Sequence, residues 1–410
     1  MRLILLLVLT IFISWLNSRL LAVMIPFWRA RPARYAFLLL SAAAVLVLVS
    51  AWPRNPPFAF PSVNLNHAVL YAALAWLSGQ LILLALQPLL YVAHRFNRTG
   101  KTPRRREGGP EGGGLPSRAE RGAAGPGLTR RAFLARTMAA APLAALGGGA
   151  QGIYGAQTEL AVVRHTLAVP DLPANLDGFK IGQLSDTHMG PFVDLARLDY
   201  ILGRLAAEKP DLVVMTGDFA DDLSLVRPAA EALAALGATV PHGVYFCWGN
   251  HEYFRDVAFI RTTLERAGIK ILKDASALVV PGRRPLYLLG ADYPPADHGG
   301  RSFNISAVRR KECFAAAAAK VPPAAVGVLI AHHPDFLYDG FAARIPLTLT
   351  GHTHGGQVVI AGRPLLDFAD YVRGLYRENG VYGYVSSGAG HWFPFRLGCP
   401  PEISVFTLTA

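Results

Sequence analysis

Three long apolar runs near the start of the sequence limit what this chain can fold into. They cover residues 3–28, 35–52 and 68–93, and a tryptophan or tyrosine lies near an end of each run. A helix needs about 20 residues to cross the hydrocarbon core of a membrane, and aromatic side chains often flank such helices. The runs therefore predict a membrane region over residues 1–96 with three transmembrane helices, rather than buried helices of a soluble domain.

Basic residues are unevenly distributed around these runs. The loop after the first run holds three arginines and the segment after the third run holds six basic side chains, whereas the loop at 53–67 contains only Arg54. Because cytoplasmic loops carry an excess of Lys and Arg, we expect the N-terminus outside and the segment after residue 96 in the cytoplasm. The net charge of +12 arises wholly within residues 1–158, so we expect a lipid bilayer as a partner and no nucleic acid.

Residues 97–131 are rich in Gly and basic residues and are predicted to form a flexible linker. The sequence TRRAFL then precedes a weakly apolar stretch rich in Ala and Gly, at residues 132–158. This stretch is either a fourth transmembrane helix or a segment similar to a twin-arginine export signal. In both cases we expect residues 159–410 to emerge on the outer, periplasmic face of the cell (inner) membrane, which predicts a multi-pass membrane protein.

From residue 159 onward, short apolar segments alternate with amphipathic stretches. Apolar residues at helical spacing predict helices over 195–209, 226–236 and 257–267. Strands and helices in turn are typical of an α/β domain. We therefore expect residues 159–410 to form one α/β domain behind the helical membrane region.

Residue types that bind metals follow five of the predicted strands. In open α/β sheets the functional crevice lies at the carboxyl ends of the strands, so these positions should converge. A single Asp after a strand is usually a turn former, but buried carboxylates and imidazoles gathered without a counter-ion would be unfavourable. Six of the twelve histidines fall in these segments. The residues concerned are Asp186, His188, Asp218, Asn250, His251, His332, His333, His352 and His354.

The spacing of these residues favours two metal ions. Residues i and i+2 of an extended segment lie roughly 6.6 Å apart, whereas the ions of a two-metal site lie about 3.5–4 Å apart. His352 and His354 can therefore each reach a different ion. Asp186 and His188 can converge on one ion, and Asp218 is the candidate to bridge both. Oxygen and imidazole ligands without sulfur suit divalent Mn, Fe, Zn or Co.

Five short blocks in this region resemble the signature of the calcineurin-like metallophosphoesterases. They occur in the family's order and at similar spacing: DTH at 186–188, GD at 217–218, GNHE at 249–252, AHHP at 331–334 and GHTHGG at 351–356. The similarity covers about residues 160–410 and is greatest to a membrane-associated bacterial branch, in which transmembrane helices or a twin-arginine signal precede the domain. The resemblance implies a sandwich of two mixed β-sheets flanked by helices.

The resemblance also implies a role for each block. The first divalent metal would be held by Asp186, His188 and His354. The second would be held by Asn250, His332 and His352. Asp218 would bridge the two metals, and His251 would act as the general acid. Glycines of the last block would let the backbone approach the ions and the substrate without Cβ clashes.

Several positions around the blocks leave alternatives open. Glu252 stands where the family has Asp. The resemblance therefore does not define how the fourth residue of this block supports the site. His333 is expected behind the second metal rather than as a ligand, and Asp221 either in solvent or behind the ligands. In the stretch GAGHWFPFR, Arg396 could contact a phosphate beside His391, or the aromatic side chains could simply close the core.

The resemblance implies a metal-dependent phosphoric ester hydrolase that cleaves a phosphodiester or pyrophosphate bond. A metal-bridging hydroxide would attack phosphorus in line, and His251 would protonate the departing oxygen. The membrane branch includes proteins similar to UDP-2,3-diacylglucosamine hydrolases, so a lipid-linked or envelope phosphate ester is the first substrate to expect. The alternatives are a broad phosphomonoesterase or nucleotidase, and a membrane sensor or transport protein with a regulatory metal-binding domain.

Overall fold

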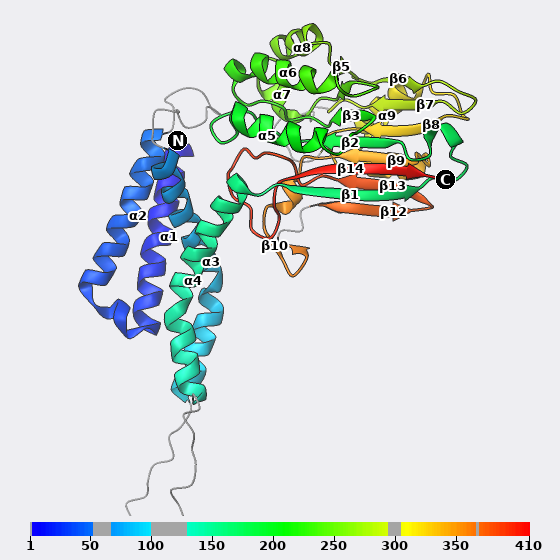
Figure 1. The fold of residues 1–410 in the computed structure, drawn as a ribbon. Coiled ribbons are helices and arrows are strands. Elements are labelled where there is room, and N and C mark those ends of the chain that lie inside the picture. Colours follow the sequence, from blue (N-terminus) through cyan, green and yellow to red (C-terminus); the bar gives the residue numbers. More distant parts are fainter. Residues whose placement is uncertain (1, 52–66, 100–128, 294–304, 366–368) are drawn as a thin grey trace, which may run out of the picture. The chain divides into compact units, whose positions relative to one another are not determined.

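The computed structural model describes the chain except for residues 1, 52–66, 100–128, 294–304 and 366–368. The chain divides into two compact units, Met1–Gln151 and Gly152–Ala410 (Figure 1). Most of the linker predicted at 97–131 falls outside the described residues, as does most of the loop at 53–67, so these two predictions stay predictions.

The first unit is helical in its described part. Two stretches there, Arg31–Val49 and Ala68–Phe96, are long and apolar enough to cross a membrane, and the apolar stretch Val8–Met24 is shorter. The last turns of the fourth helix belong to the second unit. The helices are α1 (Arg2–Met24), α2 (Arg31–Ala51), α3 (His67–Thr99) and α4 (Arg130–Thr158).

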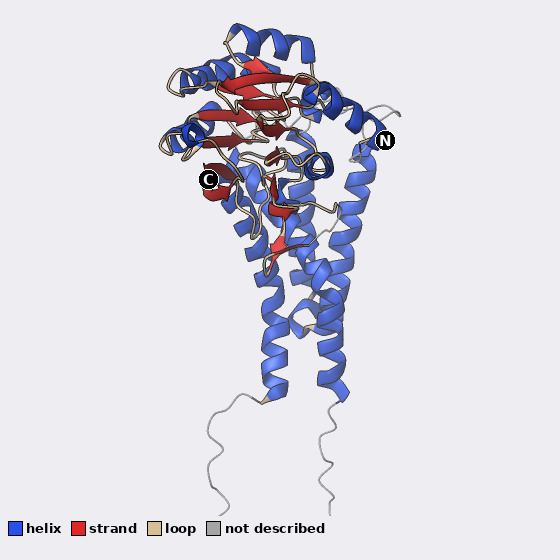
Figure 2. Cartoon of the chain, turned by 90° about the vertical axis from the view of Figure 1, so that its right-hand side faces the viewer, coloured by secondary structure: helices blue, strands red, loops and turns tan. Residues whose placement is uncertain are grey.

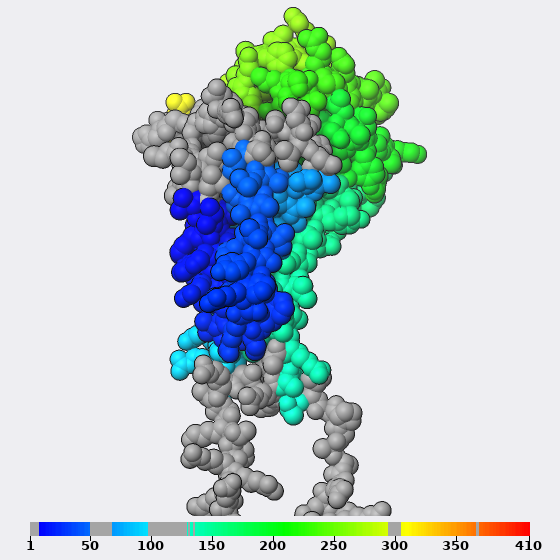
Figure 3. Space-filling view, turned by 90° about the vertical axis from the view of Figure 1, so that its left-hand side faces the viewer, coloured from blue at the N-terminus to red at the C-terminus, as the bar shows by residue number. Residues whose placement is uncertain are grey.

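This unit buries several polar side chains and exposes many large apolar ones. Asn17 donates from Nδ2 to the carbonyl oxygen of Gln80 at 3.0 Å, and Gln80 donates from Nε2 to Ser41 Oγ at 2.9 Å; all three residues are buried. Large apolar side chains such as Phe12 and Leu39 are exposed instead, and Figure 3 shows the face that α1 and α2 form. A helical bundle in water would have the opposite distribution, because water solvates polar groups and lipid tails do not.

Helices α3 and α4 approach each other closely through glycine. A Cβ atom on Gly149 would lie 2.4 Å from the carbonyl oxygen of Ala75 and 2.6 Å from the backbone nitrogen of Gly79. Small residues at such a crossing allow two helix backbones to pack directly. Met138 and Ala145 of α4 are also buried in a cluster with side chains of α1 and α3. The first part of α4 therefore packs as a helix of this bundle.

The second unit contains two six-stranded sheets, both of them mixed. The first has the order β1-β14-β2-β3-β4-β5, and the second has the order β12-β13-β9-β8-β7-β6. Strands β2 to β5 run parallel, as do β7, β8, β9 and β13, whereas β14, β6 and β12 are antiparallel to their respective neighbours β2, β7 and β13. The strands of the first sheet are β1 (Ala161–Ala168), β2 (Lys180–Leu184), β3 (Leu212–Met215), β4 (Val244–Phe246), β5 (Lys270–Ile271) and β14 (Glu402–Thr409). Those of the second are β6 (Ala275–Val280), β7 (Leu286–Gly290), β8 (Val326–Ile330), β9 (Leu347–Thr350), β12 (Gly374–Glu378) and β13 (Val381–Val385).

The core of this unit lies between the sheets, and the helices cover their outer faces. Ile181 and Val214 of the first sheet share one buried cluster with Leu288 and Leu347 of the second. Figure 2 shows the strands in the middle of the unit with helices around them. The sandwich of two mixed sheets flanked by helices, which the five blocks implied, is thus confirmed. The flanking helices are α5 (Leu195–Ala206), α6 (Leu223–Gly237), α7 (Asn250–Phe254), α8 (Val257–Arg266), α9 (Ala307–Ala318) and α10 (Phe336–Ala342), and a short hairpin joins β10 (Val359–Ile360) to β11 (Arg363–Pro364).

The three helices predicted from periodicity are α5, α6 and α8, and their boundaries match the prediction or differ from it by at most three residues. The apolar stripe predicted for α5 is buried against the first sheet. Helix α6 begins before the apolar pattern does, because Asp222 caps its N-terminus by accepting a hydrogen bond from the backbone of Ser224.

Candidate metal centre

All five predicted strand ends meet at one place in the second unit. Strands β2, β3 and β4 are neighbours in the first sheet and β8 and β9 are neighbours in the second, so their carboxyl ends share two facing edges. Backbone hydrogen bonds join the loops that follow them: His188 N donates to Asp218 O at 3.0 Å, and Gly351 N donates to His332 O at 2.9 Å. The residues that sequence analysis selected are therefore brought together.

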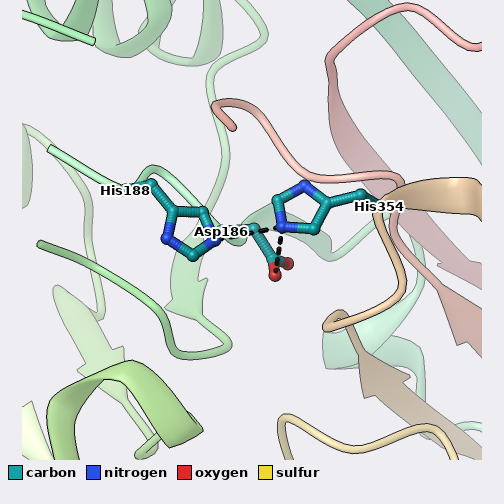
Figure 4. Close-up of side chains that lie close together, drawn as sticks. All are labelled: Asp186, His188 and His354. Atoms are coloured by element: carbon teal, nitrogen blue, oxygen red, sulfur yellow. Dashed lines mark hydrogen bonds and ion pairs between the residues drawn. The ribbon is translucent and has the colours of Figure 1, made fainter. Parts of the chain in front are cut away.

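Asp186, His188 and His354 form the first cluster (Figure 4). The Nε2 atoms of the two imidazoles lie 3.0 Å apart, and Nε2 of His354 lies 3.6 Å from Oδ1 of Asp186. All three side chains are buried. A carboxylate oxygen and two imidazole nitrogens thus point toward one another.

Asn250, His332 and His352 form a second cluster. Oδ1 of Asn250 lies 3.1 Å from Nε2 of His332 and 3.0 Å from Nδ1 of His352, and the two ring nitrogens are 3.1 Å apart. The Asn250 side chain is placed by the first turn of α7, which begins at that residue. One amide oxygen and two imidazole nitrogens therefore face a common point.

Asp218 lies between the two clusters. Its Oδ2 atom is 3.2 Å from Nε2 of His332 in the second cluster and 3.6 Å from Nε2 of His188 in the first. Its other oxygen, Oδ1, accepts a hydrogen bond from the backbone of His251 at 2.9 Å, which fixes the carboxylate. This is the position that a bridging ligand requires.

The backbone at these loops is strained. Non-glycine residues rarely adopt positive φ, and a residue held there costs about 1–3 kcal/mol. Twelve described non-glycine residues have positive φ, and five of them are residues of the two clusters or Asp218, which lies between the clusters. Strain gathered at one place is typical of sites where side-chain direction matters more than backbone stability. The five are Asp186, His188, Asp218, His352 and His354, with φ of 52°, 47°, 55°, 73° and 51°.

The glycine of the last block at position 351 packs against protein rather than leaving clearance for a substrate. A Cβ on Gly351 would lie 2.0 Å from Ser185 Oγ and 2.3 Å from Oδ2 of Asp186. The absence of a side chain here lets the loop after β9 close directly over the loop after β2. The backbone of His352 can then donate to both oxygens of Asp186, at 3.1 and 3.2 Å.

His251 lies beside the bridging position, with Nε2 4.0 Å from Oδ2 of Asp218. Its other ring nitrogen, Nδ1, lies 2.6 Å from Oδ1 of Asp221. Burial lowers the pKa of His251, but the charges of Asp221 and Asp218 outweigh this effect and raise the pKa to about 9. The contact with Asp221 favours the protonated imidazole, which is the form that a general acid requires.

Asp221 was left open as a solvated residue or one behind the ligands, and it is buried behind them. Its two oxygens contact Nδ1 of His251 at 2.6 Å and Nδ1 of His188 at 3.0 Å. Arg255 donates from Nη2 to the same carboxylate at 3.0 Å and from Nε to the backbone oxygen of Asp221 at 2.7 Å. Sequence analysis missed this linking role, and the only signal was an acidic residue three positions after Asp218.

Glu252 and His333 lie around the clusters. The Glu252 carboxylate accepts backbone hydrogen bonds from Asp218 (3.0 Å), Phe219 (2.7 Å) and Gly249 (2.7 Å), so it joins the loops after β3 and β4. The longer Glu side chain therefore supports the bridging residue from behind. The ring of His333 packs 4.9 Å from that of His352, and its Nδ1 accepts from the backbone of Asp335 at 3.2 Å.

The chemistry of the two clusters fits a pair of divalent cations. Burial raises the pKa of Asp186, and the neighbouring negative charge of Asp218 acts in the same direction. A cation between these carboxylates would remove that unfavourable interaction. His188 directs Nδ1 to Asp221, so its Nε2 is the nitrogen available to a metal, as is usual for histidine ligands. The donors are oxygen and imidazole nitrogen, which divalent Mn, Fe, Zn and Co accept.

Comparison with known proteins agrees with this geometry. The family profile described as "Calcineurin-like phosphoesterase" matches residues 179–356. Phosphodiesterase YaeI of Escherichia coli (strain K12) is 30% identical over 295 residues, which are 68% of this chain and 99% of that protein.

Two longer animal proteins are also similar. A Caenorhabditis elegans protein, F40B5.2, named for a metallophosphoesterase, is 32% identical over 271 residues, or 63% of this chain. The Danio rerio "Transmembrane protein with metallophosphoesterase domain" is 30% identical over 273 residues, also 63% of this chain. The chain spans 54% and 59% of the length of these two relatives. The last name and the apolar helices of the first unit together indicate membrane association.

These matches confirm the resemblance deduced from the five sequence blocks, and with it the expectation that the second unit is the domain of a metal-dependent phosphoester hydrolase. The chain belongs to the calcineurin-like phosphoesterase family.

Proposed function

We propose that this chain is a membrane-anchored phosphodiesterase or pyrophosphatase that works with two divalent metal ions. The observation that carries the proposal is the position of Asp218, whose Oδ2 lies 3.2 Å from His332 and 3.6 Å from His188. One carboxylate between two ligand clusters is the arrangement of a two-metal site. Asp186, His188 and His354 would hold the first ion, and Asn250, His332 and His352 the second.

His251 would donate the proton that the leaving oxygen needs. Two divalent ions, when bound, would lower the pKa of a water molecule and neutralise charge on the phosphoryl oxygens. Asp221 fixes the direction of the imidazole through Nδ1, which leaves Nε2 of His251 facing the bridging carboxylate. The proton would pass from Nε2 to the departing oxygen, so that the product leaves as an alcohol or a phosphate.

The substrate class follows from two observations of different kinds. The Escherichia coli relative is named a phosphodiesterase, which favours a diester over a monoester. The apolar helices hold the catalytic domain to a membrane, so a lipid-linked or envelope ester, of the type cleaved by UDP-2,3-diacylglucosamine hydrolases, would meet the site most often. The distribution of basic residues supports a multi-pass protein of the inner membrane with this domain on the periplasmic face.

Substrate preference tests this proposal directly. The full chain in detergent with added Mn²⁺ should hydrolyse bis(p-nitrophenyl) phosphate faster than p-nitrophenyl phosphate. A reversed preference would identify the alternative, a broad phosphomonoesterase or nucleotidase. A chain that binds two metals but cleaves neither compound, and no lipid-linked pyrophosphate, would favour a sensor or transport protein instead.

Two substitutions separate metal binding from proton transfer. His251→Ala should keep two ions and lose turnover by about 100-fold or more, because proton transfer by a positioned side chain contributes about 10²–10⁴. His352→Ala should lose metal, because it removes a proposed ligand of the second ion. Elemental analysis that finds two ions in His352→Ala would contradict the assignment of that residue.

A further inference from the structure

Arg396 is a buried cation that contacts one of the proposed metal ligands. The residue is only 3% exposed. Its Nη1 donates to the backbone oxygen of His354 at 2.6 Å, and Nη2 donates to the oxygen of Gly390 at 2.7 Å. Nη2 also lies 2.8 Å from Nδ1 of His354, the ring nitrogen on the side away from the first cluster. Arg396 therefore fixes both the backbone and the ring of His354.

The environment of Arg396 is unusual for a buried charge. None of the ion pairs among the described residues includes it, and its hydrogen-bond partners are carbonyl oxygens, an imidazole and the Cys399 thiol. Burying a guanidinium without a paired carboxylate is unfavourable, so residues of this kind are seldom found without a function. Because the guanidinium is turned inward to His354, it does not form the phosphate contact that the sequence left open.

The loop that carries Arg396 rests on the end of α4, within the second unit. The backbone nitrogen of Arg396 donates to the oxygen of Gly152 at 2.8 Å. Five residues further along the helix, Nε2 of Gln157 lies 2.9 Å from Nε2 of His391. These two contacts attach both ends of the 391–396 loop to the last turns of one helix.

Gly152 is required for this contact. A Cβ there would lie 2.2 Å from Cε2 and 2.6 Å from Cζ of Phe395, well inside van der Waals distance. Glycine inside a helix lowers stability by roughly 0.5–1 kcal/mol relative to alanine. Glycine at this position therefore lowers the stability of the helix but allows the Phe395 ring to pack closely against it.

We propose that two residues in the last turns of α4, Gly152 and Gln157, position a metal ligand of the catalytic domain. The helix holds the 391–396 loop, and through that loop Arg396 holds His354 in the direction that the first metal requires. Arg396 is thus a positioning residue, and the end of α4 within the second unit is part of the assembly of the site. This inference rests on the proposed two-metal function and adds to it a structural requirement for Gly152 and Gln157.

The experiment compares substitutions in the full chain purified in detergent. Gly152→Ala and Arg396→Gln are the tests, and Gly155→Ala is the matched control, because a Cβ there would meet Glu159 only at an ordinary 3.4 Å. The metal-free proteins are titrated with Mn²⁺, and bound ions are followed by equilibrium dialysis and by the electron paramagnetic resonance signal of a coupled Mn²⁺ pair. Thermal unfolding of each metal-free protein reports general damage.

Both test variants should bind one ion about 10–100-fold more weakly, the usual effect of losing a group that orients a ligand. The other ion should bind as in the wild type, so the coupled-pair signal should give way to that of isolated Mn²⁺ at intermediate concentrations. Gly155→Ala should match the wild type. Replacing Phe395 by Ala, which lacks all the ring atoms that would meet the new Cβ, should restore the coupled pair in Gly152→Ala but not in Arg396→Gln.

Three outcomes would overturn the inference. Wild-type affinity for both ions in Gly152→Ala and Arg396→Gln would show that the contacts are irrelevant to the site. Equal weakening of both ions together with a lower unfolding temperature of the metal-free protein would show general structural damage. A wild-type chain that binds no pair of ions would overturn the proposed function as well, which distinguishes that failure from the first two.

Discussion

At the scale of single residues, Asp221 connects the group proposed for proton transfer with a proposed metal ligand. One oxygen contacts Nδ1 of the proposed acid His251 and the other contacts Nδ1 of the proposed ligand His188. Burial raises the pKa of Asp221, but the two histidines outweigh it and hold the pKa well below its usual value. The carboxylate therefore stays charged and serves both imidazoles at once.

Asp221→Asn should lower turnover more than metal binding. An amide presents one oxygen and one NH₂ group, so it can accept a hydrogen bond from only one of the two Nδ1–H groups. We expect kcat to fall by about 100-fold or more and the affinity for the first ion to fall by about 10-fold or more. Steady-state kinetics and metal titration measure these effects. Asp222→Asn is the control, because Asn caps helix α6 as well as Asp does, and a comparable loss in that variant would contradict the role given to Asp221.

Glu252 stabilises the same region through the backbone. It accepts three backbone N–H groups with two carboxylate oxygens, and in Glu252→Gln one of these positions becomes an NH₂ group that faces a donor. Leaving buried donors unsatisfied costs about 1–3 kcal/mol, so the second unit should unfold several degrees earlier. Thermal unfolding followed by circular dichroism measures the shift, with the exposed Glu265→Gln as control. An unchanged midpoint in Glu252→Gln would refute this account of the Glu at that position.

At the scale of elements, the sequence predicted the chemistry that lies at strand ends and missed the contacts that come from distant segments. Asp186, Asp218 and His352 follow apolar strands, and parallel strands bring their carboxyl ends together. Arg396 and Gly152 are separated by more than 240 positions, and nothing in either segment indicates the other. The positive φ angles of the site residues could not be predicted from the sequence either. Sterics favour Gly at positive φ, whereas here Asp and His adopt it under the constraint of their surroundings.

Two glycines of α4 should respond to alanine in opposite ways. A Cβ on Gly149 would meet the backbone oxygen of Ala75 at 2.4 Å, whereas a Cβ on Gly147 would meet nothing within 4 Å. Both changes improve helix propensity by roughly 0.5–1 kcal/mol, so Gly147→Ala should raise the unfolding temperature of the chain in detergent. Gly149→Ala should lower it, because α3 and α4 must separate. Equal shifts for the two variants would contradict the close contact between these helices.

At the scale of the whole molecule, the basic loops predict the side of the membrane on which catalysis takes place. If residues 132–158 form the predicted fourth transmembrane helix, a C-terminal alkaline phosphatase fusion, which folds only in the periplasm, should be active, whereas a C-terminal green fluorescent protein exported unfolded should be dark. Both expected results follow from the positive-inside rule applied to the basic residues of the first 106 positions. A bright green fluorescent fusion with silent phosphatase would place the domain in the cytoplasm and restrict its substrates to those found there.

The central claim is that two ions, bridged by Asp218, act together in one phosphoester hydrolysis. Metal-free full-length protein should be titrated with Mn²⁺ while hydrolysis of bis(p-nitrophenyl) phosphate is recorded at each step. We predict little turnover with the first equivalent bound and a rise to the maximum as the second equivalent binds. Full activity with one equivalent, or activity that persists after removal of all metal, would contradict the claim.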